Sequence, residues 1–145
     1  MQFDHFEIVG IAIEAGLSIM DVYDSSVQIE VQSKEDDSPL TKADIAAHKT
    51  IIRGLSTINP EVPVVSEEGR VGDPKKSELA WLVDPLDGTK EFIKRNGMFT
   101  VNIALMKRMG PQWKPIFGVV HAPVNRTTWF GGVDVSATKI TDAET

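Results

Sequence analysis

Two carboxylates, Asp84 and Asp87, stand three residues apart in the string Leu-Val-Asp-Pro-Leu-Asp-Gly-Thr at residues 82–89. They follow an apolar Trp-Leu-Val run that predicts a buried strand. Pro85 and Gly88 predict a turn at the end of that strand, so that both carboxylates and a backbone carbonyl between them converge. Clusters built only of oxygen ligands suit Mg²⁺ rather than zinc. The string therefore predicts a magnesium site.

A second acidic group, the neighbouring pair Glu67 and Glu68, comes at the end of another short apolar run. Repulsion between adjacent carboxylates is relieved when a cation lies beside them. We expect this pair to join Asp84 and Asp87 around one or two metal ions, as in a magnesium-dependent phosphatase or a part of one. An alternative stays open: aspartates of a plain turn can cap backbone amides, and neighbouring glutamates can simply face solvent.

Gly88 and Thr89 stand just before a predicted helix, where backbone amides and the helix dipole favour phosphate oxygens. Thr89 could also be the N-cap of that helix, and the two roles are compatible. The basic residues that follow, Lys90, Lys94 and Arg95, either recognise an anionic substrate or form a solvated helix face. These residues indicate phosphate chemistry without choosing a substrate.

Asp44 and the three histidines carry weaker signals. The Thr41-x-x-Asp44 spacing resembles a helix capping box, so spacing alone favours a structural role for Asp44. His5, His48 and His121 show no metal-ligand spacing, and we interpret His48 and His121 as structural.

Composition and charge narrow the function classes. The 145 residues fit one domain with a sizeable core. A net charge of −6 without a basic cluster disfavours binding to nucleic acid or to a membrane surface. The absence of cysteine excludes disulfides, thiolate metal sites and cysteine nucleophiles. No apolar run approaches the ~20 residues of a spanning helix, and the first residues lack signal-peptide features, so we expect a cytoplasmic protein.

Hydrophobic periodicity predicts two helices followed mainly by strands. Helices are expected at residues 3–24 and 41–58. Strands are expected at residues 27–32, 62–65, 81–83, 99–105, 116–120 and 128–130. The strands at 99–105 and 116–120 should form an antiparallel hairpin with a long loop. The fold class is therefore α+β, with two N-terminal helices packed on a mostly antiparallel sheet.

The remaining segments are expected to be less regular. Residues 69–78 should form a charged loop, and residues 90–95 a helical turn or two. Residues 136–145 are expected to form a polar tail after a domain at residues 1–135.

Taken together, the motifs at 66–68 and 81–93 resemble the inositol monophosphatase superfamily. The continuation at 89–97 is similar to its 3'(2'),5'-bisphosphate nucleotidase branch. The similarity also includes residues 39–44 and 99–105 and covers nearly all of residues 1–132. It implies the N-terminal half of the inositol monophosphatase-like, or sugar-phosphatase, fold.

The resemblance implies hydrolysis of adenosine 3',5'-bisphosphate to AMP and phosphate by a metal-activated water, with Mg²⁺ required, Li⁺ inhibitory and a place in sulfur assimilation. It assigns site roles residue by residue. The metal ligands would be Glu67, Asp84, Asp87 and the carbonyl of Leu86. Asp44 and Thr89 would orient and deprotonate the attacking water, with Glu68 as a nearby acid. The substrate would contact Gly88, Thr89 and Lys90.

One feature departs from the family pattern. Family members run to roughly twice the size of one ordinary domain, and their second half supplies a further metal-binding aspartate in a Trp-Asp motif. Here Trp113 precedes Lys114, and Trp129 precedes Phe130. The resemblance therefore implies a missing C-terminal half, and an exposed apolar surface that favours a homo-oligomer.

Three alternatives are kept. A haloacid-dehalogenase phosphatase would place its two aspartates two residues apart instead of three. An inositol monophosphatase-type sugar phosphatase would share the metal motif. A catalytically incomplete fragment that binds metal is the third, and it follows from the missing aspartate.

Overall fold

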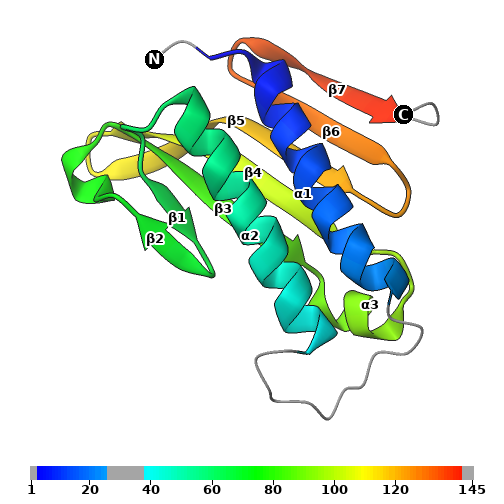
Figure 1. Ribbon diagram of the computed structural model, residues 1–145. Coiled ribbons are helices and arrows are strands. Elements are labelled where there is room, and N and C mark those ends of the chain that lie inside the picture. The colour runs from blue at the N-terminus through cyan, green and yellow to red at the C-terminus, as the bar shows by residue number, and fades with distance from the viewer. Residues whose placement is uncertain (1–2, 26–37, 142–145) are drawn as a thin grey trace.

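The computed structural model describes residues 3–25 and 38–141. Helices α1 (His5–Ser25) and α2 (Pro39–Ile58) pack side by side on one face of a seven-stranded sheet (Figure 1). The short helix α3 (Thr89–Lys94) lies at one end of the sheet, close to the first turns of α2 (Figure 1). The predicted α+β class is confirmed.

The sheet is mixed but mostly antiparallel. Its strands are β1 (Val64–Ser66), β2 (Gly69–Val71), β3 (Leu79–Asp87), β4 (Thr100–Met109), β5 (Gln112–Ala122), β6 (Thr127–Gly132) and β7 (Val135–Thr141). Their spatial order is β2-β1-β3-β4-β5-β6-β7. Only the β1–β3 pair is parallel among the described strands. A 3₁₀ turn at Pro74–Lys76 joins β2 to β3.

The core lies between the two long helices and the sheet. Helix α2 buries Ala43, Ala47, Ile51 and Leu55, whose four-residue spacing forms one stripe on the helix. Strand residues that point toward the helices are buried, such as Trp81 on β3. Full burial of a large apolar side chain contributes about 1.5–3 kcal/mol, so this interface fixes how the helices lie on the sheet.

Helix α2 begins at Pro39, two residues earlier than predicted. Ser38 is its N-cap and accepts a hydrogen bond of 3.2 Å from the Thr41 backbone N–H, and Pro39 occupies the first turn. Thr41 lies inside the helix, so the expected capping box between Thr41 and Asp44 does not form. The structural role considered for Asp44 at the start of the helix is therefore wrong.

Three predictions about loops and the C-terminal segment differ from the observed strands. The β4–β5 loop is short because Met109 pairs with Gln112, with Gly110 in the left-handed region at φ +62°. The predicted loop at 69–78 contains β2, which pairs with β1, and the 3₁₀ turn. Residues 136–141, expected as part of a polar tail, belong to β7. As an edge strand with mostly exposed side chains, β7 lacks the apolar alternation that would reveal it.

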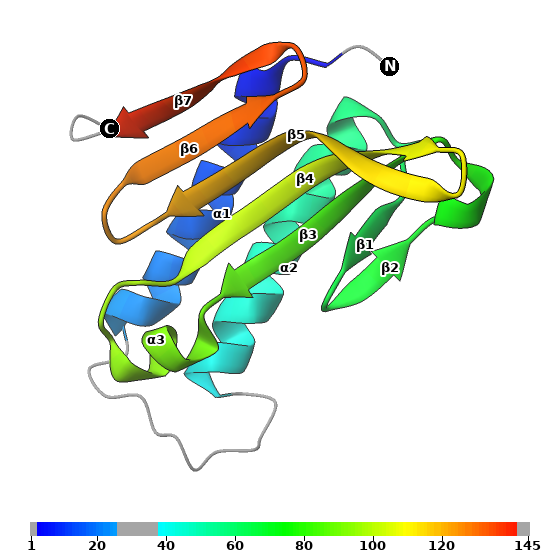
Figure 2. The same cartoon turned by 180° about the vertical axis from the view of Figure 1, so that it is seen from behind.

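The strand predicted at 27–32 lies outside the described residues. The face of the sheet opposite the helices is uncovered within residues 3–25 and 38–141, as Figure 2 shows. Its exposed apolar side chains are Leu82, Val120 and Trp129, exposed by 50%, 38% and 42%. Exposure of apolar surface agrees with the expectation, while self-association stays a prediction. No helix in the described part of the chain is long and apolar enough to cross a membrane.

Candidate active site

A bulge in β3 places Asp84 and Asp87 on the same side of the strand. Asp84 pairs with Asn102 of β4, and Asp87 pairs with Thr100, so three residues on β3 span two on β4. In a regular strand a spacing of three would put the side chains on opposite faces, and one extra residue restores the same face. Pro85 occupies the bulge, where its missing N–H costs no ladder bond.

The strand therefore does not end in a turn at Pro85, as the sequence predicted. It continues through the bulge to Asp87, and Leu86 is buried between the two aspartates. The bulge, and not a turn, places the two carboxylates on the same side of the strand.

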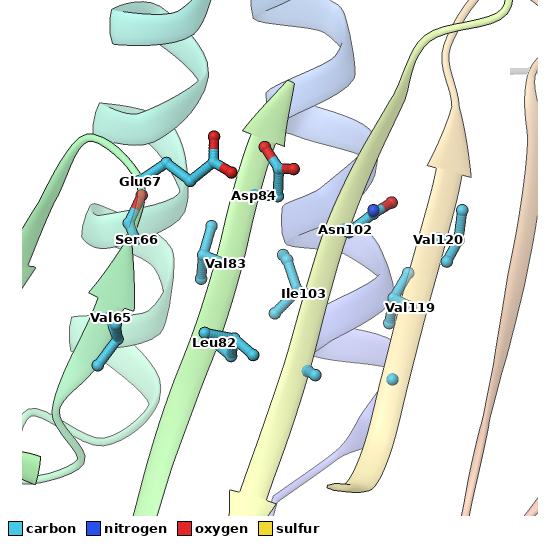
Figure 3. A pocket seen from close by; sticks show the side chains of 12 residues that line it. Val65, Ser66, Glu67, Leu82, Val83, Asp84, Asn102, Ile103, Val119 and Val120 are labelled. Atoms are coloured by element: carbon cyan, nitrogen blue, oxygen red, sulfur yellow. The ribbon is translucent and has the colours of Figure 1, made fainter. Parts of the chain in front are cut away.

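Glu67 comes next to Asp84 because β1 runs parallel to β3. Ser66 at the end of β1 pairs with Val83, so the next residue on each strand is acidic. Figure 3 shows the carboxylates of Glu67 and Asp84 directed toward one another at the end of the two strands. Glu68 follows in the turn to β2 and is exposed, as is Glu67. Glu67 and Asp84, which are distant in the sequence, thus become neighbours.

Asp44 faces this group from α2. Burial, followed by the charges of Glu68, Asp84 and Glu67, raises the pKa of Asp44 to about 7 from its ordinary value of 3.8. Like charges act on Asp44 only because the helix brings it close to the strand ends. Asp44 therefore lies near Asp84 and the Glu67–Glu68 pair, which its spacing in the sequence did not predict.

Asp84 is also difficult to ionise. Burial, and then the charges of Glu67 and Asp87, raise its pKa to about 6, although a backbone hydrogen bond from Leu86 acts in the opposite direction. Its Oδ1 is buried and has no hydrogen-bond partner among the described residues. A buried carboxylate oxygen without a partner is costly unless a cation or donor satisfies it.

The oxygen atoms of these carboxylates are suitable ligands for a hard divalent cation. Their present positions are too far apart to bind one. Among residues 3–25 and 38–141, no three acidic or histidine side chains lie close enough to hold a metal ion. Mutual repulsion separates like charges, and Glu67 and Glu68 are exposed on long side chains that can rotate. The unpartnered Asp84 oxygen and the all-oxygen donors are what Mg²⁺ prefers. We therefore judge that the residues fit the metal, with a rotation of the glutamates required.

Two residues that sequence reasoning missed position Asp87. The Asn102 side-chain amide donates a hydrogen bond of 3.1 Å to Asp87 Oδ2. The Thr100 hydroxyl donates to Asn102 Oδ1 at 3.0 Å, which orients the amide. The sequence feature that could have identified them is that Thr100 and Asn102 are polar residues on the strand that follows the aspartate motif.

The start of α3 needs glycine. Gly88 is its N-cap residue at φ +100°, in the left-handed region. Thr89 and Lys90 follow as exposed residues in the first turn. Gly88 is the N-cap and no side chain of the described residues caps this helix start, so Thr89 is not the N-cap that we considered. The predicted phosphate-contacting residues are thus accessible beside Asp87.

The basic residues after Lys90 separate into two groups. Lys94 is exposed. Arg95 donates a hydrogen bond of 2.9 Å to the Tyr23 carbonyl and lies over the Tyr23 ring at 4.1 Å. Arg95 therefore fastens α3 to the end of α1, which is the structural alternative for this residue.

A hollow of about 520 Å³ opens beside the acidic residues on the uncovered face of the sheet. Glu67, Asp84 and Asn102 stand at its polar end, and its floor is apolar, with Leu82 and Val120 along it (Figure 3). The hollow is large enough for a small-molecule ligand, and its acidic end would suit a ligand that arrives with a cation.

The fold and the site define a class: an α+β domain with carboxylates gathered at the ends of a parallel strand pair, beside a helix start. The model of the inositol monophosphatase family matches residues 3–139. The chain belongs to this family.

Relatives and solved structures agree with this membership. The chain is 52% identical over 130 residues to the 3'(2'),5'-bisphosphate nucleotidase CysQ of Salmonella typhimurium, covering 86% of this chain and 50% of the relative. It is 55% identical over 120 residues to CysQ of Escherichia coli K12, covering 81% of this chain and 47% of that relative. The crystal structure of CysQ from Bacteroides thetaiotaomicron matches with a TM-score of 0.81 and 38% identity over 94% of this chain and 48% of that one. The chain spans about half the length of the curated relatives it matches.

Proposed function

We propose that the chain is part of a Mg²⁺-dependent phosphomonoesterase that converts adenosine 3',5'-bisphosphate to AMP and phosphate. The similarity to proteins named 3'(2'),5'-bisphosphate nucleotidase, at 52% and 55% identity, supports the nucleotide substrate. The observation that carries the proposal is the β3 bulge, which puts Asp84 and Asp87 on one side of the strand beside Glu67. The proposal includes inhibition by Li⁺ and a role in sulfur assimilation in the cytoplasm.

Glu67, Asp84, Asp87 and the carbonyl of Leu86 would hold Mg²⁺. When bound, Mg²⁺ would supply positive charge that stabilises phosphoryl oxygens and makes a water more acidic. Two observations support this assignment. The buried Oδ1 of Asp84 has no hydrogen-bond partner among the described residues, and the Asn102 amide orients the Asp87 carboxylate. Four oxygen donors would thus come from β3 and from the turn that follows β1.

Asp44 and Thr89 would orient the attacking water and take its proton. Asp44 lies on α2 and Thr89 begins α3, and the two helices are in contact. In the metal-free chain the pKa of Asp44 is raised to about 7, which makes its carboxylate a better proton acceptor than an ordinary aspartate. Glu68 would act as a neighbouring acid that tunes Asp44 through its charge. The phosphate would be held by the backbone amides of Gly88 and Thr89 and by the Lys90 ammonium.

A second candidate is a metal-binding domain that is catalytically incomplete by itself. It is favoured by the finding that no three acidic or histidine side chains converge within the described residues. A further ligand and the nucleoside contacts would then come from the other half that the longer relatives contain, or from a second copy of this chain.

The deciding experiment is phosphate release from adenosine 3',5'-bisphosphate by the 145-residue chain with Mg²⁺, with and without Li⁺. The substrate panel adds an inositol phosphate and fructose bisphosphate, which test the sugar-phosphatase alternative. Release that favours the nucleotide and falls with Li⁺ supports the proposal. A folded chain that binds Mg²⁺ but releases no phosphate from any of them supports the incomplete domain instead.

A further inference from the structure

His48 of α2 contacts the turn that carries Glu67 and Glu68. Its Nδ1 lies 3.1 Å from the hydroxyl oxygen of Ser66. The same oxygen accepts a hydrogen bond of 3.2 Å from the Glu68 backbone N–H. A hydroxyl offers one hydrogen and two acceptor positions, so Ser66 makes both bonds at once. A single serine therefore joins the helix to the turn.

The place of His48 on α2 connects this contact with Asp44. Residues four apart on a helix lie on the same face, so His48 and Asp44 approach the strand ends from one side of α2. Asp44 senses the charges of Glu67 and Glu68, and His48 contacts the serine that precedes them. Helix α2 thus directs both the Asp44 carboxylate and the His48 ring toward the Glu67–Glu68 turn.

We infer that His48 is a positioning residue, which through Ser66 holds the Glu67–Glu68 turn near Asp44 and arranges its carboxylates for a divalent cation. The inference rests on the proposed function, because it assigns His48 to that same site. Exposed glutamates lose conformational freedom when they bind a cation, and a turn that is already anchored reduces this loss. Partners that orient ligands in this way typically change metal affinity about 10-fold or more when removed.

A merely structural bond between α2 and β1 is the competing explanation, and Thr50 provides a matched control for it. Thr50 also lies on α2, and its hydroxyl is 2.9 Å from the Ser18 hydroxyl of α1. Thr50→Val keeps the side-chain shape and removes the hydroxyl, which contacts Ser18 of α1 and also donates to the Ala46 carbonyl of α2 at 3.0 Å. If only stability matters, Thr50→Val and His48→Ala should behave alike.

The test is calorimetric titration of Mg²⁺ into the full 145-residue chain and its variants. We expect His48→Ala to weaken Mg²⁺ binding about 10-fold and Thr50→Val to leave it unchanged. An asparagine amide reaches the place of Nδ1, whereas a glutamine amide reaches farther, toward Nε2. His48→Asn should therefore restore the affinity and His48→Gln should not, which keeps the inference testable even if His48→Ala fails to fold.

Hydrogen exchange of the Glu68 amide in metal-free protein gives a second readout. We expect faster exchange in His48→Ala and unchanged exchange in Thr50→Val. Equal Mg²⁺ affinity, or equal exchange, in wild type and His48→Ala overturns the inference while the proposed function stands. Absence of Mg²⁺ binding by the wild type overturns the proposed function, and the inference fails with it.

Discussion

The Asn102 side-chain amide donates a hydrogen bond of 3.1 Å to Asp87, across the bulge that separates Asp87 from Asp84. Thr100 fixes the direction of that amide through its own bond of 3.0 Å to the Asn102 oxygen. The two bonds limit the rotation of an exposed carboxylate at the edge of the site. The orientation of Asp87 therefore depends on the neighbouring strand β4 as well as on β3.

Replacing Asn102 with alanine should weaken Mg²⁺ binding about 10-fold, because Asp87 would lose the partner that orients it. The fold should change little, since an exposed hydrogen bond contributes only about 1 kcal/mol. Calorimetric titration gives the affinity, and urea unfolding gives the free energy of unfolding. An unchanged affinity would contradict an orienting role for Asn102.

Asp87→Asn should abolish Mg²⁺-dependent phosphate release, because it removes a charged ligand and leaves the shape of the side chain nearly unchanged. The Asn102 bond can persist to the amide oxygen, so the folded structure should survive. Activity with adenosine 3',5'-bisphosphate is compared with thermal unfolding of the same preparation. An active Asp87→Asn protein would refute the assignment of Asp87 as a metal ligand.

Thr89→Ala should lower turnover by about 10²-fold or more and leave Mg²⁺ affinity nearly intact, because Thr89 would act on the water and not on the metal. Thr89 is exposed and no side-chain cap holds the helix start, so stability should be little affected. Turnover and calorimetric titration separate the two effects. A large loss of Mg²⁺ affinity would instead make Thr89 part of the metal site.

The free energy of unfolding in EDTA should fall as the pH rises from about 4 to about 7. The pKa of Asp44 is raised to about 7 and that of Asp84 to about 6, both from 3.8, so the folded chain keeps protons that the unfolded chain has released. Wherever the folded state binds more protons, stability decreases with increasing pH. Urea unfolding at acidic and alkaline pH measures this change.

Asp44→Asn is the matched variant for that measurement, since asparagine does not ionise. It should reduce the pH dependence to the part that Asp84 contributes, and Mg²⁺ should raise the stability of the wild type most at alkaline pH. An Asp44→Asn protein with the full pH dependence of the wild type would show that other groups cause it.

Gly88→Ala should destabilise the fold by about 1–3 kcal/mol, because alanine at φ +100° is strained. The new Cβ would also lie 3.3 Å from the backbone Cα of Phe99 and 3.0 Å from Glu91 Oε1. Gly110→Ala is the control: Gly110 has φ +62°, but nothing lies within 4 Å of the added Cβ. Urea unfolding should therefore show a smaller loss for Gly110→Ala, and equal losses would contradict the role of the close contact.

The long elements and the acidic motif were predictable from sequence because their signals are local. The two helices carry apolar stripes, and strand β4 carries a clear alternation, so their positions follow from periodicity. Strand β7 escaped prediction because its side chains are mostly exposed, and the stable partner of its backbone is β6. The short loop between β4 and β5 was missed because the strands continue beyond their apolar residues.

The sequence by itself determined which carboxylates are available, but the turn that it predicted at Pro85 is a bulge within β3. Only the tertiary structure decided that Asp84 and Asp87 share a face, because the bulge is defined by pairing with β4. It also decided that Asp44 and His48 belong with the acidic turn, since helix α2 is fixed by burial of Ala47 and Ile51 against the sheet and not by any pattern near those polar residues. Contacts between residues far apart in the chain come from packing, so the local spacing of residues in the sequence does not predict them.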